Sequence, residues 1–168
     1  MLDRETIREL LGGQSPLLEG MLDQETQLQP NGIDLTLKSV STIVSQGFVG
    51  ASPAERVLSS TQEIPFGDDG SLSLSPGSYL ITLNEVVNLP LGLAALGRPR
   101  SSLLRCGVAI HTAVWDAGYS GRSQALLVVY NPHGFRLSRD ARVMQLVFVR
   151  LSKQVPQGYD GIYQGENV

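Results

Sequence analysis

Apolar and polar residues alternate with a period of two through much of the chain. Side chains of a β-strand point to opposite faces in turn, so this alternation predicts strands with one buried face. Turn-forming Gly, Pro, Asn and Asp residues separate the alternating segments. Many strands, frequent turns and little helix favour an all-β sandwich or barrel. Five segments carry the strand pattern: residues 30–40, 79–87, 108–110, 125–130 and 143–151.

The pattern changes outside these segments. Residues 3–11 have apolar positions at helical spacing, with Asp3 suited to cap the helix and Gly12 directly after its last turn. We expect a loop over residues 15–29, where no period is evident. Residues 41–70 are rich in Ser and Gly with short apolar pairs, which predicts irregular β structure and loops.

Two features concern the organisation of the domain. Residues 126–129 are continuously apolar, which predicts a strand that is buried on both faces or that faces another subunit. Residues 156–168 have no strand pattern. Termini fray by default, but two tyrosines and a glutamine in this tail suit a flexible flap over a ligand. With 168 residues and no repeat or linker, we expect a single domain over residues 1–168.

Composition and charge narrow the classes of partner. The net charge is −3 and the pI is near 5.3, which argues against a general nucleic-acid binder because such a protein needs a basic face. No apolar run reaches transmembrane length, and the charged N-terminus is unlike a secretory signal. Cys106 is the single cysteine, so no internal disulfide can form; we expect it to be buried and inert. These features predict a cytoplasmic protein without nucleic-acid or membrane partners.

Polar residues are dense in residues 97–121, between apolar residues of strand type. Arg100, Ser101 and Ser102 can form an anion grip, because guanidinium groups bind phosphate oxygens in pairs and hydroxyl groups complete such a cradle. A helix or turn starting near Ser102 would add free N–H groups. Ion pairs at the surface are the alternative interpretation. Arg105 stands between apolar neighbours, so it should be paired or bind a ligand.

A carboxylate follows this cluster. Asp116 lies in a predicted turn, where it can orient or deprotonate an attacking water, or be an ordinary turn residue. Tyr119 can stack on a sugar or base, or pack across strands. His111 lies in a strand, where a lone histidine is usually structural. The chain lacks the His and Cys pattern of the zinc deaminases and has no P-loop, so both chemistries are excluded.

Several motifs together resemble the dUTPase / dCTP deaminase superfamily over nearly the whole chain. MLDRETIRELL is similar to the N-terminal helix of the deaminase-type members, QPNGIDLTL to the first motif and GRPRSSLLRCG to the second. AVWDAGYSG is similar to the third motif, ARVMQLVF to the fourth and GIYQGEN to the closing tail. The order and spacing of RSSLLRCG, WDAGYSG and RVMQLVF make the resemblance specific.

The resemblance implies a distorted, jelly-roll-like β-barrel assembled as a homotrimer with active sites shared between subunits. It also implies Mg²⁺ that is held mainly by the substrate's triphosphate and by water. The resemblance also implies roles for single residues. The phosphates are bound by Arg100, Ser101, Ser102 and Gln145, a metal-bound water contacts Asp34, and Asp116 orients the attacking water. Tyr119 packs on the deoxyribose, backbone groups from about His111 to Trp115 recognise the pyrimidine, and Tyr163 and Gln164 close over the nucleotide.

Members of the superfamily catalyse two reactions, and one segment of the sequence distinguishes the two kinds of enzyme. The deaminases use a glutamate on the strand after the third motif, where this chain has Val128; residues 122–131 contain no Asp or Glu. Without that base we predict a dUTP diphosphatase that releases dUMP and pyrophosphate. Two alternatives remain: a mono- or bifunctional dCTP deaminase that releases ammonia from dCTP, and a non-catalytic nucleotide-binding trimer. The spacing from Arg105 to Asp116 is about two residues short of the deaminase pattern.

Overall fold

The computed structural model describes residues 1–168 and contains three α-helices, one 3-10 helix and fourteen strands. The helices are α1 (Arg4–Leu11), α2 (Gln24–Gln27), η1 (Pro53–Glu55) and α3 (Ser101–Arg105). The strands are β1 (Leu18–Glu19), β2 (Leu28–Gln29), β3 (Gly32–Ile43), β4 (Phe48–Val49), β5 (Arg56–Val57), β6 (Thr61–Glu63), β7 (Ser71–Leu74), β8 (Gly77–Asn88), β9 (Leu93–Pro99), β10 (Val108–His111), β11 (Val114–Trp115), β12 (Ser120–Val129), β13 (Phe135–Ser138) and β14 (Arg142–Arg150).

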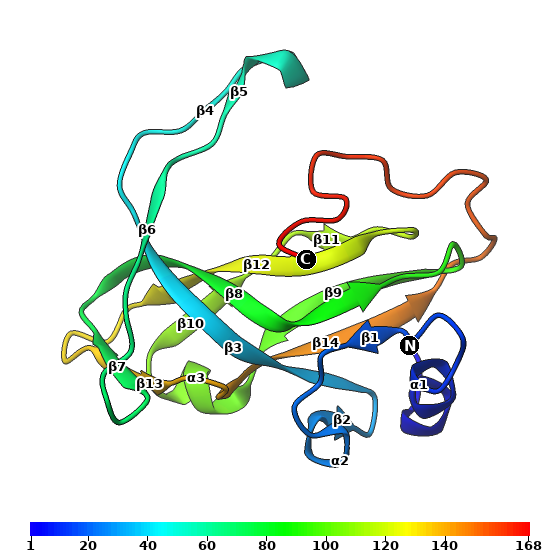
Figure 1. Cartoon of the computed structure of the whole chain (residues 1–168), viewed down its shortest axis with the longest axis horizontal. Coiled ribbons are helices and arrows are strands. Elements are labelled where there is room, and N and C mark those ends of the chain that lie inside the picture. Colours follow the sequence, from blue (N-terminus) through cyan, green and yellow to red (C-terminus); the bar gives the residue numbers. More distant parts are fainter.

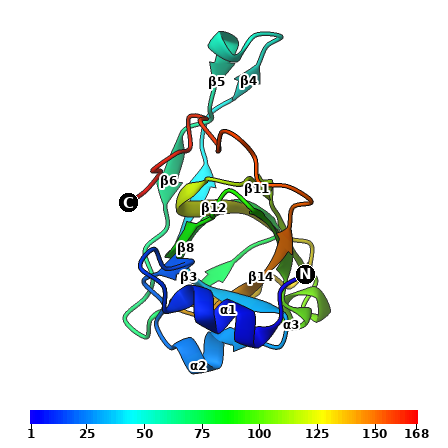
Figure 2. The ribbon, with the colours of Figure 1, turned by 90° about the vertical axis from the view of Figure 1, so that its right-hand side faces the viewer.

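Ten of the strands form one antiparallel sheet that curls around the core. Its central order is β10-β12-β8-β3-β14-β9-β11, with β1, β2 and β6 attached at its margins. Figure 2 looks into the curled sheet and shows β12, β8, β3 and β14 surrounding the interior. The predicted mainly β, barrel-like fold with a short N-terminal helix is therefore confirmed.

Strand β3 connects the two halves of the curled sheet. Its residues 33–36 pair with β14, whereas residues 37–42 pair with β8. Side chains from both faces of this strand are covered, so the alternation seen in the sequence does not mean alternate exposure here: residues 32–37 are all buried. The inner face of the sheet carries the largest buried side chains, among them Leu35, Ile81, Leu127 and Phe148. Burying such side chains supplies most of the driving force for the fold.

Helix α1 forms as the sequence predicts. The Asp3 side chain accepts a hydrogen bond from the Thr6 backbone N–H (3.0 Å), which caps the helix, and Ile7 is fully buried beneath it. Leu2, just before the helix, donates from its backbone N–H to the carbonyl oxygen of Phe148 (2.9 Å). The beginning of the chain is thus held on its last strand, and Figure 1 shows α1 beside β14.

Some expectations need correction. The expected loop at residues 15–29 contains β1, α2 and β2, which are too short to leave a periodic pattern. Asp23 starts α2 because its side chain accepts hydrogen bonds from the backbone N–H groups of Glu25 and Thr26. In residues 126–129, Leu127 and Val129 are buried and the alternate side chains are half-buried, so this strand is not buried on both faces within one chain. That it faces another subunit stays a prediction. None of the helices is long and apolar enough to cross a membrane.

Residues 41–70 form irregular β structure, as expected. Part of this segment, with β4, η1 and β5, projects from the body as a narrow arm (Figure 1). The arm is closed by the pairing of Phe48 with Val57 and of Val49 with Arg56.

Candidate functional site

The predicted anion grip lies at the start of α3. Arg100 is the residue before the first helical turn, with extended backbone angles, and its backbone N–H donates to the carbonyl oxygen of Val143 on β14 (3.0 Å). Ser101 and Ser102 form the first turn of the helix and are exposed. The hydroxyl groups are therefore open to a ligand, and the predicted helix start is confirmed, one residue before Ser102.

Asp34 ties the grip to the sheet. Its Oδ2 atom lies 3.0 Å from Nε of Arg100 and 3.4 Å from Nη1 of Arg142. Burial raises the pKa of Asp34, and the charges of the two arginines oppose that rise. Asp34 alternates with the apolar residues Ile33 and Leu35, a pattern that also suits a merely solvated aspartate, but the residue is only 2% exposed. It holds the guanidinium group of Arg100, the residue directly before the two serines, and that of Arg142.

Gln145 lies close to the same cluster. On β14 it is opposite Asp34 of β3 on one side and Arg98 of β9 on the other. It is half-buried. The structure therefore brings together four of the residues that the sequence singled out, Arg100 and Gln145 with Asp34 between them, and Ser101 at the helix start.

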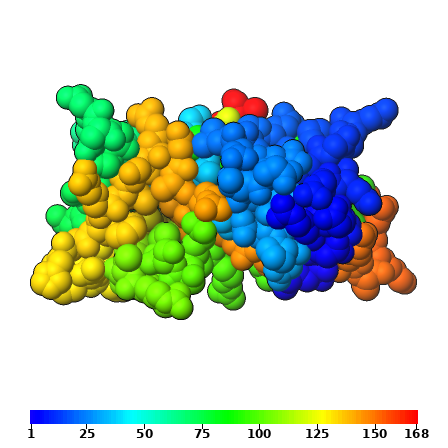
Figure 3. Space-filling view, turned by 90° about the horizontal axis from the view of Figure 1, so that it is seen from below, coloured from blue at the N-terminus to red at the C-terminus, as the bar shows by residue number.

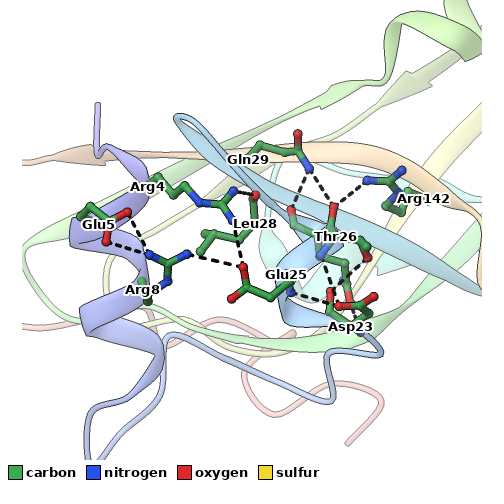
Figure 4. A network of polar contacts seen from close by, with 10 residues as sticks. Arg4, Glu5, Arg8, Asp23, Glu25, Thr26, Leu28, Gln29 and Arg142 are labelled. Atoms are coloured by element: carbon green, nitrogen blue, oxygen red, sulfur yellow. Dashed lines mark hydrogen bonds and ion pairs between the residues drawn. The ribbon is translucent and has the colours of Figure 1, made fainter.

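Arg142 was missed by the sequence reasoning. Its Nη1 atom donates to the carbonyl oxygen of Thr26 in α2 (2.6 Å) as well as contacting Asp34. Figure 4 shows this bond beside the neighbouring network in which Arg4 and Arg8 of α1 hold Glu25 of α2. In the space-filling view of Figure 3, α3, the start of β14 and α2 adjoin on one face of the molecule. The signal for Arg142 was its position three residues before Gln145 in ARVMQLVF.

Other residues of the predicted stretch point elsewhere. Arg105 is exposed, and its Nη1 atom donates to the carbonyl oxygen of Ser101 (3.1 Å), so it is not in the apolar setting that its neighbours suggested. Cys106 is exposed, not buried, because it lies in the turn that ends α3. His111 is exposed at the end of β10, opposite Leu126.

Asp116 belongs to a second cluster. It is exposed in the turn between β11 and β12, and the turn packs so that Tyr119 is buried. Burial raises the pKa of the Tyr119 hydroxyl, which is hydrogen-bonded to Ser123 and Glu166 and stays protonated. A cavity of about 230 Å³ opens beside these residues, lined by Ala113, Val114, Trp115, Asp116, Tyr119, Ser123, Gln124, Tyr159, Tyr163 and Glu166.

The C-terminal tail lies over this cavity. The Gln164 side chain accepts from the backbone N–H of Ser120 and donates to the carbonyl oxygen of Gly118, each at 3.0 Å. The Tyr119 hydroxyl donates to Oε1 of Glu166 (2.8 Å), and burial raises the pKa of this glutamate. Figure 1 shows the tail above β11 and β12. Glu166 had no counterpart in the sequence reasoning, which named only Tyr163 and Gln164 in the tail.

The grip and Asp116 lie far apart within one chain. Val114 pairs with Leu96 and Trp115 with Ala95. Because β11 is antiparallel to β9, Asp116 follows Trp115 in the direction that leads away from the Arg100 end of β9. Along β9, the positions of Asp116 and Arg100 are therefore separated by about five to six residues of extended strand. At roughly 3.3 Å for each residue this is about 15–20 Å. Figure 1 shows α3 and β11 on opposite sides of the molecule. Asp116 cannot hold a water at a phosphate that Arg100 of the same chain binds.

Comparison with known proteins gives a consistent assignment. The profile of the family described as "dCTP deaminase-like" matches residues 1–151. The chain is 50% identical over 167 residues to the probable deoxyuridine 5'-triphosphate nucleotidohydrolase of Methanosarcina mazei, covering 99% of this chain and 98% of the relative. It is 36% identical over 143 residues to the deoxyuridine 5'-triphosphate nucleotidohydrolase of Methanocaldococcus jannaschii, covering 84% of this chain and 90% of the relative.

A solved structure has a similar fold. The 2'-deoxycytidine 5'-triphosphate deaminase of Agrobacterium tumefaciens superposes with a TM-score of 0.68 and 25% sequence identity. The superposition covers 90% of this chain and 48% of that one.

Proposed function

Because the chain belongs to the dCTP deaminase-like family, we propose that it is a dUTP diphosphatase, which converts dUTP and water to dUMP and pyrophosphate. The observation that carries the proposal is the end-to-end similarity to relatives named as deoxyuridine 5'-triphosphate nucleotidohydrolases. A second observation supports it. Val128 pairs with Ala109 near the end of β12, and its segment from 122 to 131 has no carboxylate to serve as a base for deamination.

In the mechanism that we propose, the Asp116 carboxylate accepts a hydrogen bond from a water and directs it in line at the α-phosphorus. The bond from this phosphorus to the bridging oxygen breaks, and pyrophosphate leaves. Arg100 donates to phosphate oxygens from the Nη atoms that Asp34 does not contact, and Ser101 and Ser102 donate from their hydroxyl groups. These donors stabilise the charge that builds on the oxygens during the reaction. Positioning and electrostatics supply most of the acceleration in such transfers.

We further propose Mg²⁺ as the cofactor. When bound to a triphosphate, this ion neutralises phosphate charge. The chain has no cluster of three His, Cys, Asp or Glu residues that could form a protein cage. It has instead one buried carboxylate beside the grip, Asp34, whose Oδ1 atom has no hydrogen-bonding partner in the protein and is not enclosed. This arrangement fits an ion held by the triphosphate and water, with Asp34 accepting a hydrogen bond from its hydration shell.

The separation of Asp116 from the grip supports a homotrimer with active sites shared between subunits, because a neighbouring chain must then supply the missing half. Mixing of subunits tests this. Asp116→Asn and Arg100→Gln variants should each be inactive, and random co-assembly in equal amounts should restore about a quarter of the wild-type activity. No recovery after verified exchange of subunits would contradict shared sites.

Residues 156–168 act in this proposal as a flexible flap, with Tyr163 and Gln164 closing over the nucleotide and Tyr119 packing on the deoxyribose. Backbone groups near residues 113–115 line the cavity and can read the pyrimidine edge. His111 is not among the residues that line it. The single domain over residues 1–168 and the cytoplasmic location stay predictions.

The alternative is a dCTP deaminase, which the fold shared with the Agrobacterium enzyme favours. One panel of assays decides: dUTP, dCTP, dTTP and UTP with Mg²⁺, with pyrophosphate and ammonia measured separately. Pyrophosphate from dUTP without ammonia from dCTP is the expected result. Ammonia from dCTP would establish the deaminase, and tight binding without turnover would establish a non-catalytic nucleotide-binding trimer.

A further inference from the structure

A fully buried carboxylate lies behind the anion grip. Glu85 on β8 is 0% exposed and forms no ion pair with a basic residue. Burial raises its pKa, and hydrogen bonds from its neighbours oppose the rise. An unpaired buried carboxylate destabilises a fold unless hydrogen-bond donors surround it. We therefore expect the buried carboxylate of Glu85 to have a specific role.

All three donors to Glu85 come from β3, which carries Asp34, and from α2, whose Thr26 carbonyl accepts from Arg142. The backbone N–H of Thr36 donates to Oε2 (3.0 Å), and the Thr36 hydroxyl donates to Oε1 (2.6 Å). The side-chain amide of Gln27 also donates to Oε1 (2.7 Å). Thr36 belongs to β3, two residues beyond Asp34, and Gln27 ends α2.

Thr36 lies where β3 changes partner. Residues 33–36 pair with β14, and pairing with β8 begins at Leu37, opposite Leu83. At this crossing Thr36 has no partner residue on β8, and its backbone N–H donates to the Glu85 side chain instead. The carboxylate thus fixes the backbone of β3 at the end of the segment that carries Asp34.

Gln27 extends the same support to Asp34 itself. Its side chain is 1% exposed, and its Nε2 atom donates both to Glu85 and to the backbone carbonyl oxygen of Asp34 (2.9 Å). Its Oε1 atom accepts from the backbone N–H of Asp23 (3.0 Å), which places the amide with one orientation only. Every polar atom of this side chain is therefore used.

We propose that Glu85 is a positioning residue for the triphosphate grip: through Thr36 and Gln27 it fixes the part of β3 that carries Asp34, and so sets the direction of the Arg100 and Arg142 guanidinium groups. This inference rests on the proposed function, because it assumes that the grip binds a polyphosphate. Glu85 does not touch the ligand. It acts only through Asp34, whose Oδ2 atom contacts both arginines.

Binding of inorganic triphosphate with Mg²⁺, measured by titration calorimetry on the folded protein, tests the proposal. Glu85→Gln places an amide donor against the donors of Thr36 and Gln27. We therefore expect the affinity for triphosphate to fall about ten- to a hundredfold, the loss typical of residues that hold the ligands of a metal site in place. Gln27→Met removes the hydrogen bonds from α2 to Glu85 and to the Asp34 carbonyl without changing any residue of β3, and we expect a loss of similar size. The double variant should lose little more than either single one, because both act by the same route.

Ile81→Val is the matched control, since it trims a fully buried side chain on the same strand away from the grip. It should lower thermal stability and leave triphosphate affinity within about twofold. If Glu85→Gln and Gln27→Met lower stability only, with unchanged affinity of the folded protein, Glu85 is structural and the proposal fails. Wild-type protein that does not bind triphosphate also overturns it.

Hydrolysis of dUTP by the wild-type protein is measured alongside. If the protein binds triphosphate but does not hydrolyse dUTP, the proposed function fails, whereas the affinities of the variants still decide the role of Glu85.

Discussion

Replacement of Asp34 by asparagine is the most direct test of the grip. Asp34→Asn removes the charge that holds Arg100 at 3.0 Å and Arg142 at 3.4 Å, and leaves both guanidinium groups without their carboxylate. Breaking a fully buried pair costs about 3–5 kcal/mol. The two arginine side chains are 31% and 35% exposed, so solvent screens part of the interaction and the cost should be about 1–3 kcal/mol. For a protein of this size that lowers the melting temperature by about 3–10 °C.

The catalytic loss should be larger than the loss of stability suggests. Arg100 without its partner no longer points in one direction, and such misplacement costs about a hundredfold in kcat/KM. Unfolding in guanidinium chloride and release of pyrophosphate from dUTP measure the two effects. Asp69→Asn is the control, because it breaks an ion pair with Arg136 that is exposed and distant in sequence from the grip. If both variants hydrolyse dUTP at the wild-type rate, Asp34 does not organise the phosphate site.

Three further predictions concern the second cluster. Asp116→Asn should abolish release of pyrophosphate while dUTP still binds; activity above about a tenth of wild type would contradict a water-directing role. Gly118→Ala should loosen the tail and speed its proteolysis, because Gly118 has φ +85° and an added Cβ would meet Gly158 Cα at 2.6 Å. Gly70→Ala, with φ +70° and nothing within 4 Å, controls for backbone strain alone. Burial raises the pKa of Glu166 above its ordinary 4.5, so protons bind the folded state more tightly and stability falls as pH rises through the raised pKa. In Glu166→Gln the melting temperature should decrease less as the pH rises. A variant whose melting temperature depends on pH as steeply as that of the wild type would refute this role of Glu166.

The sequence predicted the fold where the local pattern and the tertiary environment agree. Residues 79–87 alternate and lie in β8, residues 143–151 alternate and lie in β14 up to Arg150, and Asp3 caps α1 as its position suggests. The short α2 escaped because one capping aspartate and a single turn leave no period. In β3 the period of two was present, but both faces are covered, so the alternation did not reveal that Asp34 is buried.

The residues of the candidate site were also predicted only in part from the sequence. Arg100 and Asp116 could be found because each lies within a specific motif. Arg142 and Glu166 also lie within motifs, ARVMQLVF and GIYQGEN, but those motifs did not assign either residue a role. Their partners, like those of Glu85, are more than forty residues away in sequence, such as Asp34 for Arg142 and Tyr119 for Glu166. Long-range pairing of this kind is a property of the register between strands, which local pattern does not contain.

The attachment of the beginning of the chain to its last strand has a consequence for synthesis on the ribosome. Leu2 bonds to Phe148, and β3 finds half of its ladder only in β14. Until residue 150 has left the exit tunnel, residues 33–36 of β3 have no β14 to pair with, and the backbone N–H of Leu2 has no acceptor. Such non-local closure slows folding and exposes unpaired strand edges to other chains in the meantime. The nascent protein should therefore depend on protection by chaperones until its final strand emerges, and a chain truncated before residue 142 should aggregate.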